Sequence, residues 1–158
     1  EKLCAFTGEL EITPAAIEKL TTKNLESTVF LLAKAVVAGD PQKAYSILDL
    51  LFSQNEEPVA ILAVLSSSYV DMYRAAASIR SGLAVTEAAK HFDYKGKEFR
   101  LRNAERDSRG VSLPVLRRSL DVLLKADLAL KGARGDRRIT LERYIAELLL
   151  LAKGGEPV

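Results

Sequence analysis

The stretch Pro58–Gly82, PVAILAVLSSSYVDMYRAAASIRSG, decides the fold class of this 158-residue chain. Its large apolar residues fall at Ile61, Leu62, Leu65, Tyr69, Met72 and Tyr73. This spacing of three to four positions places them on one face of an α-helix. Pro58 suits the first helical turn, where a missing N–H costs nothing, and Gly82 is a typical stop. We therefore predict a long amphipathic helix that ends at about Arg80.

Helical spacing continues on both sides of this stretch. The predicted further helices cover residues 14–20, 26–38, 41–52, 87–92, 96–106, 113–131 and 139–152. Thr13-Pro14 and Asp40-Pro41 are cap-plus-proline helix starts, and Thr86 is the expected cap of the short helix 87–92. Gly39 is an expected stop, and a polar break is expected at Thr21–Asn24. No stretch alternates cleanly enough to indicate a strand, so the sequence predicts an all-α helical bundle.

Composition limits the kind of protein. The chain has 23 basic and 21 acidic residues, a net charge of +2, which is too balanced to indicate a nucleic-acid partner by itself. Its single cysteine, Cys4, fits a reducing, cytoplasmic setting, and no apolar run is long enough to span a membrane. The chain begins at Glu1 and its one methionine is Met72, so we expect it to derive from a longer protein.

Residues that carry catalysis or bind cofactors are scarce. The nine glycines are scattered, and no phosphate-binding loop sequence occurs. His91 and Cys4 are the only soft metal ligands and lie far apart in the sequence. Ser66-Ser67-Ser68 lacks a sequence signal for an activating base, and small residues in a helix also permit close helix packing. We therefore predict no catalytic, cofactor-binding or metal-binding residues, and no enzyme activity.

The most basic stretch favours an alternative function. Residues 81–109 have the look of a helix-turn-helix, which would place basic side chains near a DNA backbone. These side chains are Lys97, Arg100, Arg102 and Arg106. Interleaved acidic residues, among them Glu98 and Glu105, are more typical of a solvated face. DNA binding through Lys97–Arg109 therefore stays open as the alternative.

Two further features indicate surface contacts. Leu148, Leu149, Leu150 and Leu151 advance by about 100° per residue and so point around most of the last helix. Such a helix is covered on several sides, either by a neighbouring chain or a missing part of this one, or because it lies at the centre of its own domain. In the preceding turn, Arg134, Arg137 and Arg138 form a basic group suited to weak phosphate contact.

The order of several short segments carries a family resemblance. These segments are Phe30-Leu31-Leu32 with Ala38-Gly39-Asp40, Leu50–Leu62, Gly82-Leu83 with Glu87-Ala88-Ala89, Leu123–Lys131, and Leu141-Glu142 with the leucine-rich helix. Together they resemble the C-terminal region of the delta subunits of bacterial DNA polymerase III clamp loaders. The resemblance extends from about Leu25 to Ala152.

This resemblance implies a helical collar domain at residues 25–152, a remnant of a preceding lid domain at 1–24 and a frayed tail at 153–158. In the family, collars pack against one another and hold the subunits in an open ring of five that loads the sliding clamp. The clamp is bound by an N-terminal domain absent here, and delta-type subunits do not hydrolyse ATP.

The resemblance also gives the surface features a role. It makes Leu148–Leu151 candidates for a subunit interface. It also implies that the helix-turn-helix pattern is a pair of short collar helices that does not read DNA bases. The basic turn Arg134–Arg138 would lie on the collar surface, where any contact with template DNA would be indirect or weak. The resemblance implies no cofactor and no membrane partner.

Overall fold

The computed structural model describes residues 14–132 and 135–154 of the chain. All regular secondary structure in these ranges is helical, which confirms the predicted all-α class. The helices are α2 (Pro14–Val37), α3 (Pro41–Ser53), α4 (Pro58–Arg80), α5 (Val85–His91), α6 (Glu98–Asp107), α7 (Leu113–Gly132) and α8 (Arg137–Ala152).

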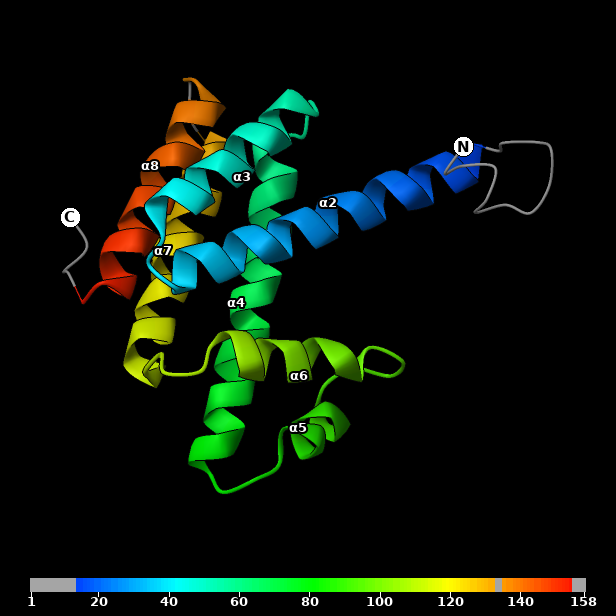
Figure 1. Cartoon of the computed structure of the whole chain (residues 1–158), viewed down its shortest axis with the longest axis vertical. Coiled ribbons are helices and arrows are strands. Elements are labelled where there is room, and N and C mark those ends of the chain that lie inside the picture. The colour runs from blue at the N-terminus through cyan, green and yellow to red at the C-terminus, as the bar shows by residue number, and fades with distance from the viewer. Residues whose placement is uncertain (1–13, 133–134, 155–158) are drawn as a thin grey trace.

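Helix α4 is the central element of the bundle. It runs along the long axis of the molecule, with α7 and α8 on one side, α2 and α3 near its upper part, and α5 and α6 at its lower end (Figure 1). The residues that the opening stretch placed on its inner face are buried: Ile61, Leu62, Leu65, Tyr69 and Met72. Tyr73 is half-buried against the same core.

Local capping explains where several helices begin and end. The Asp40 carboxylate accepts a hydrogen bond of 3.0 Å from the Lys43 backbone N–H at the start of α3. Gly39 and Gly82 follow α2 and α4 with φ of 68° and 72°, a left-handed conformation that glycine adopts without steric cost. These caps confirm the start predicted at Asp40-Pro41 and the stops predicted at both glycines.

Two local predictions are wrong. The expected polar break at Thr21–Asn24 is absent, because α2 is one continuous helix of 24 residues. Threonine, lysine and asparagine lower helix propensity by less than about 1 kcal/mol each, whereas proline in a helix interior costs about 3 kcal/mol. The short helix α5 begins at Val85, with Ala84 rather than Thr86 at its N-cap position. Thr13, the predicted cap of α2, lies outside the described residues.

Candidate subunit interface

The leucine-rich helix α8 is mostly covered by its own chain. Leu148, Leu149 and Leu151 are buried, because α8 packs against α2, α4 and α7. Leu150 differs, since 44% of its surface is exposed. Of the two explanations that the sequence left open, the central position in its own domain accounts for three of the leucines. Only Leu150 is left as a candidate contact with a neighbouring chain.

The outer side of α8 carries a second exposed apolar residue. Ile139 is 64% exposed and lies in the first turn of the helix. At 3.6 residues per turn, Ile139, Arg143 and Leu150 share the face opposite the buried leucines. Arg143 lies 4.7 Å above the ring centroid of Tyr144, and its Nε is 3.7 Å from the Glu147 carboxylate. This face therefore combines apolar and charged side chains.

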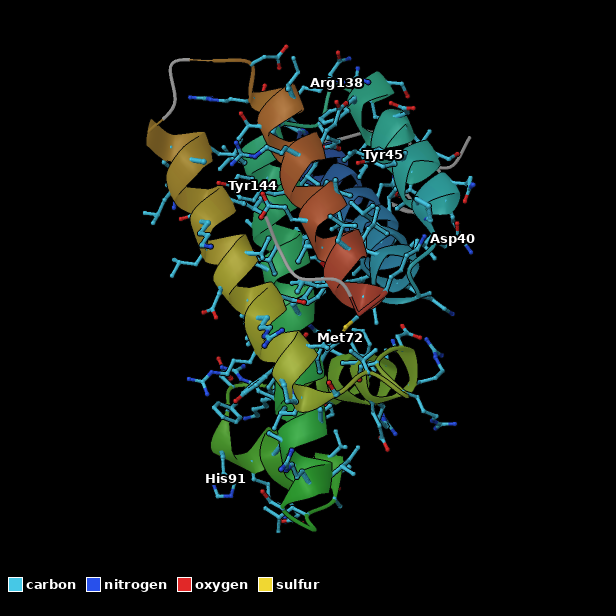
Figure 2. The ribbon with its side chains drawn as sticks, turned by 90° about the vertical axis from the view of Figure 1, so that its left-hand side faces the viewer. Asp40, Tyr45, Met72, His91, Arg138 and Tyr144 are labelled. Carbon is cyan, nitrogen blue, oxygen red and sulfur yellow. The ribbon has the colours of Figure 1, made fainter. Side chains whose placement is uncertain are left out.

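Helix α7 adds two exposed leucines. Leu124 and Leu128 are 60% and 63% exposed, one helical turn apart, and lie opposite the buried side of α7. Figure 2 shows α7 and α8 side by side on the same face of the molecule. We call the surface formed by Leu124, Leu128, Ile139 and Leu150 the α7–α8 face.

The exposed leucines of α7 were not predicted as site residues from the sequence. The signal was present, because Leu123-Leu124 and Leu128 with Leu130 supply more large apolar residues than one inward face accommodates.

The basic turn before α8 is partly engaged within the chain. Arg138 binds Asp49 of α3 at 2.9 Å and Glu142 at 2.8 Å, and its guanidinium lies 4.6 Å from the ring centroid of Phe52. The hydrogen bond to Glu142 raises the pKa of Arg138. Arg137 is exposed, and Arg134 lies outside the described residues.

Helix α3 is tied to α8 by a second hydrogen bond. The Tyr45 hydroxyl donates to the Glu142 backbone carbonyl at 3.3 Å. Both Tyr45 and Arg138 are labelled in Figure 2, where they project from neighbouring helices. The described part of the basic turn therefore offers Arg137 to solvent, while Arg138 links α8 to α3.

The segment of the helix-turn-helix alternative is held against α4. Its Arg100 binds the buried carboxylate of Asp71 at 2.8 Å and the Ser67 hydroxyl at 2.6 Å. The Tyr94 hydroxyl donates to the other carboxylate oxygen of Asp71, and Arg74 donates to Tyr94 at 2.9 Å. Burial and the hydrogen bond to Asp71 raise the pKa of Tyr94. Arg100 therefore points into the protein and is unavailable to a DNA backbone.

The remaining candidates also occupy structural positions. His91 is exposed at the end of α5, at the lower end of the molecule (Figure 2). Ser68 is buried and donates to the Val64 carbonyl at 3.0 Å, within its own helix. Among the described residues, no group of three or more His, Cys, Asp or Glu side chains is placed to hold a metal ion. The same part of the chain contains no helix with the length and apolarity that crossing a bilayer requires.

The fold and its exposed α7–α8 face define an all-α domain with a candidate protein-binding surface. The chain belongs to the family described as the DNA polymerase III delta subunit, C-terminal domain, whose sequence model matches residues 26–148. This assignment confirms the family resemblance.

Two relatives from Bacillus subtilis are similar over nearly the whole chain. The DNA polymerase III subunit delta of strain 168 is 27% identical over 158 residues, which are 99% of this chain and 45% of that protein. The solved structure of the DNA clamp loader delta protein matches with a TM-score of 0.74 and 28% identity. That match covers 94% of this chain and 43% of the solved chain. The chain thus spans less than half the length of these relatives.

Proposed function

We propose that this chain is the non-catalytic assembly region of a delta-type clamp-loader subunit, and that its α7–α8 face binds neighbouring subunits of the loader. The names of the family and of both relatives support the clamp-loader role. The carrying observation is the exposure of Leu124, Leu128 and Ile139, each at 60% or more, on two adjacent helices.

The composition of the α7–α8 face supports a protein partner. Stable interfaces have an apolar centre with charged residues at the rim, and they bury at least about 1,000 Å² in total. Leu124, Leu128, Ile139 and Leu150 supply exposed apolar surface on both helices, while Arg143 and the exposed Asp121 and Lys125 supply polar surroundings. Burying these side chains on association would remove apolar surface from water, the main favourable contribution to stable assembly.

The domain limits expected from the sequence become part of this proposal. We assign residues 25–152 to the collar and 1–24 to the end of a preceding lid domain. Burial supports this limit, since Lys23 and Asn24 are exposed whereas Leu25 and Val29 pack on the core. The two units would share helix α2, so that the limit lies within a continuous helix.

The other partners follow from the same role. In a five-subunit loader acting in DNA replication in the bacterial cytoplasm, this region would hold subunits in place. The sliding clamp would be bound by other parts of the full-length subunit. DNA contact by this region would be weak, since Arg138 is engaged with Asp49 and Glu142. The DNA-reading alternative is not favoured, because Arg100 is bound to Asp71.

Reconstitution of the loader tests the proposed interface. The full-length delta subunit carrying Leu124→Glu and Leu128→Glu is mixed with the other loader subunits, and the products are sized by sedimentation velocity. We expect assembly to weaken by at least about tenfold, because two carboxylates would be buried without partners.

A matched variant controls for the added charge. Leu83→Glu changes a residue that is 50% exposed in the turn between α4 and α5, away from the α7–α8 face, and should assemble normally. Circular dichroism of all variants checks the helical fold. Normal assembly of the Leu124→Glu/Leu128→Glu variant would contradict the placement of the interface on these helices.

A further inference from the structure

A pocket of about 160 Å³ lies between α2 and α6, on helices other than those of the α7–α8 face. Ala33, Met72 and Ala104 contribute apolar lining and are buried. Leu31 of α2 and Phe99 of α6 also line it, yet 53% and 51% of their surfaces are exposed. Single exposed apolar residues are ordinary, but here two from different helices border the same hollow.

The size of the pocket indicates what it accommodates. A cavity of about 150 Å³ with aliphatic walls takes up a molecule of the size of benzene. Pockets that bind metabolites or drugs have volumes of about 300–1,000 Å³, which is larger than this one. At protein interfaces, by contrast, a single buried aromatic or aliphatic anchor often fills a small socket. The volume therefore favours one large apolar side chain of a protein segment.

Charge at the pocket favours a carboxylate beside that side chain. Five charged residues line it: Lys34, Arg100, Arg106, Asp71 and Asp107. Arg100 and Asp71 neutralise each other at the floor. Lys34 Nζ and Arg106 Nε lie 3.7 and 2.9 Å from the same carboxylate oxygen, Oδ1 of Asp107, so that two cations share one anion. Both cationic side chains are more than half exposed, whereas that of Asp107 is 15% exposed.

We propose that this pocket is a docking site for a protein segment that carries a large apolar side chain next to a carboxylate. The apolar side chain enters between Leu31 and Phe99, and the carboxylate lies against Lys34 and Arg106. Exposed ion pairs add little affinity but fix which segment binds and in which orientation. The proposal is independent of the clamp-loader role and of the α7–α8 face.

Synthetic peptides test both parts of this proposal. Three dye-labelled helical peptides of alanine and glutamate are titrated with the chain and followed by fluorescence anisotropy. One carries a phenylalanine flanked by glutamates, the second replaces the phenylalanine with alanine, and the third replaces the flanking glutamates with lysines. We expect the first to bind at least about tenfold more tightly than the second and about threefold more tightly than the third.

Variants of the pocket make the test specific. Leu31→Glu should weaken binding of the first peptide by at least about tenfold, because it places a carboxylate at the apolar entrance. Arg106→Glu should reverse the preference, so that the lysine peptide binds more tightly than the glutamate peptide. Arg102→Glu, an exposed change one turn earlier in α6 and outside the pocket lining, is the matched control and should keep the original preference.

Three results would overturn the proposal. One is the absence of binding by the first peptide at about 1 mM. Another is equal affinity for all three peptides, which would indicate nonspecific binding. The third is an equal effect of Arg102→Glu and Arg106→Glu, which would place the charge contact outside the pocket. Thermal unfolding of each variant, whose changed residue is exposed, verifies that the fold is intact.

Discussion

The guanidinium of Arg100 binds the buried carboxylate of Asp71 across the contact between α6 and α4, with Nε at 2.9 Å and Nη2 at 2.8 Å from Oδ2. The second carboxylate oxygen accepts from the Tyr94 hydroxyl. Both oxygens of Asp71 are therefore satisfied, although the residue is only 4% exposed. This arrangement attaches the lower helices α5 and α6 to the long central helix.

Removal of Arg100 should destabilise the fold strongly. Arg100→Ala leaves the Asp71 carboxylate buried without its cation, and we expect unfolding free energy to fall by about 3 kcal/mol in urea titrations. Arg102→Ala, an exposed change on the same helix, should alter it by less than about 0.5 kcal/mol. Equal stabilities for the two variants would mean that the ion pair does not hold α6 in place.

Tyr94→Phe should have a smaller and pH-dependent effect. At pH 7 we expect a loss of about 1–3 kcal/mol, because a buried carboxylate oxygen loses its donor. Tyrosine ionises near pH 10 in the unfolded chain, while burial and the hydrogen bond to Asp71 raise the pKa of Tyr94 in the fold. Between these two pKa values the folded state holds a proton that the unfolded state has lost, so stability falls as pH rises.

The alkaline part of this prediction is measured as a difference. The contribution of the Tyr94 proton is complete below pH 10 and declines above it, so the gap between wild type and Tyr94→Phe should narrow above pH 10. Burial also raises the pKa of Tyr69. Because Tyr69 is present in both proteins, its contribution to the pH dependence cancels in the difference. A gap that stays constant from pH 8 to pH 11 would contradict the proposed role of the hydroxyl.

Truncation of two neighbouring leucines of α8 should lower the unfolding free energy by very different amounts. Leu149→Ala opens a cavity in the core and should cost about 2–4 kcal/mol of unfolding free energy. Leu150→Ala, one residue later on the exposed side, should cost less than about 0.5 kcal/mol in the same denaturant titration. A large loss for Leu150→Ala would show that this side chain is buried in solution.

The start of α8 depends on one aspartate. The Asp136 carboxylate accepts hydrogen bonds from the backbone N–H groups of Arg138 at 2.8 Å and Ile139 at 3.3 Å. We expect Asp136→Ala to lower the melting temperature and to cost about 1 kcal/mol, the usual value of an N-cap. Asp136→Asn keeps an oxygen acceptor and should recover most of the loss; failure to do so would argue against capping.

Much of the bundle could be predicted from residue spacing. The α4 pattern works because a helix buried on one side repeats its apolar residues with the period of the helix itself. The break expected in α2 was wrong because polarity alone does not end a helix. The polar residues Thr21–Asn24 change solvation but leave the backbone hydrogen bonds of the helix intact. Stops at Gly39 and Gly82 were correct because they depend on backbone conformation alone.

The candidate site was harder to predict than the fold. Four consecutive leucines in α8 indicate a helix covered on several sides, but only packing decides which sides the same chain covers. The apolar excess of α7 can be read from its sequence, but it does not show which neighbours leave Leu124 and Leu128 exposed. Asp71 and Arg100 are separated by 29 positions, so their pairing has no local signature.

The unbroken backbone of α2 has a mechanical consequence. A helix of 24 residues is about 36 Å long, and it lacks glycine throughout and proline beyond its first position. Its C-terminal half is fixed by packing, while its N-terminal half extends away from the bundle (Figure 1). Such an element acts as a lever: a tilt imposed near Pro14 is carried as a torque into the packed helices, with no joint along its length to absorb it.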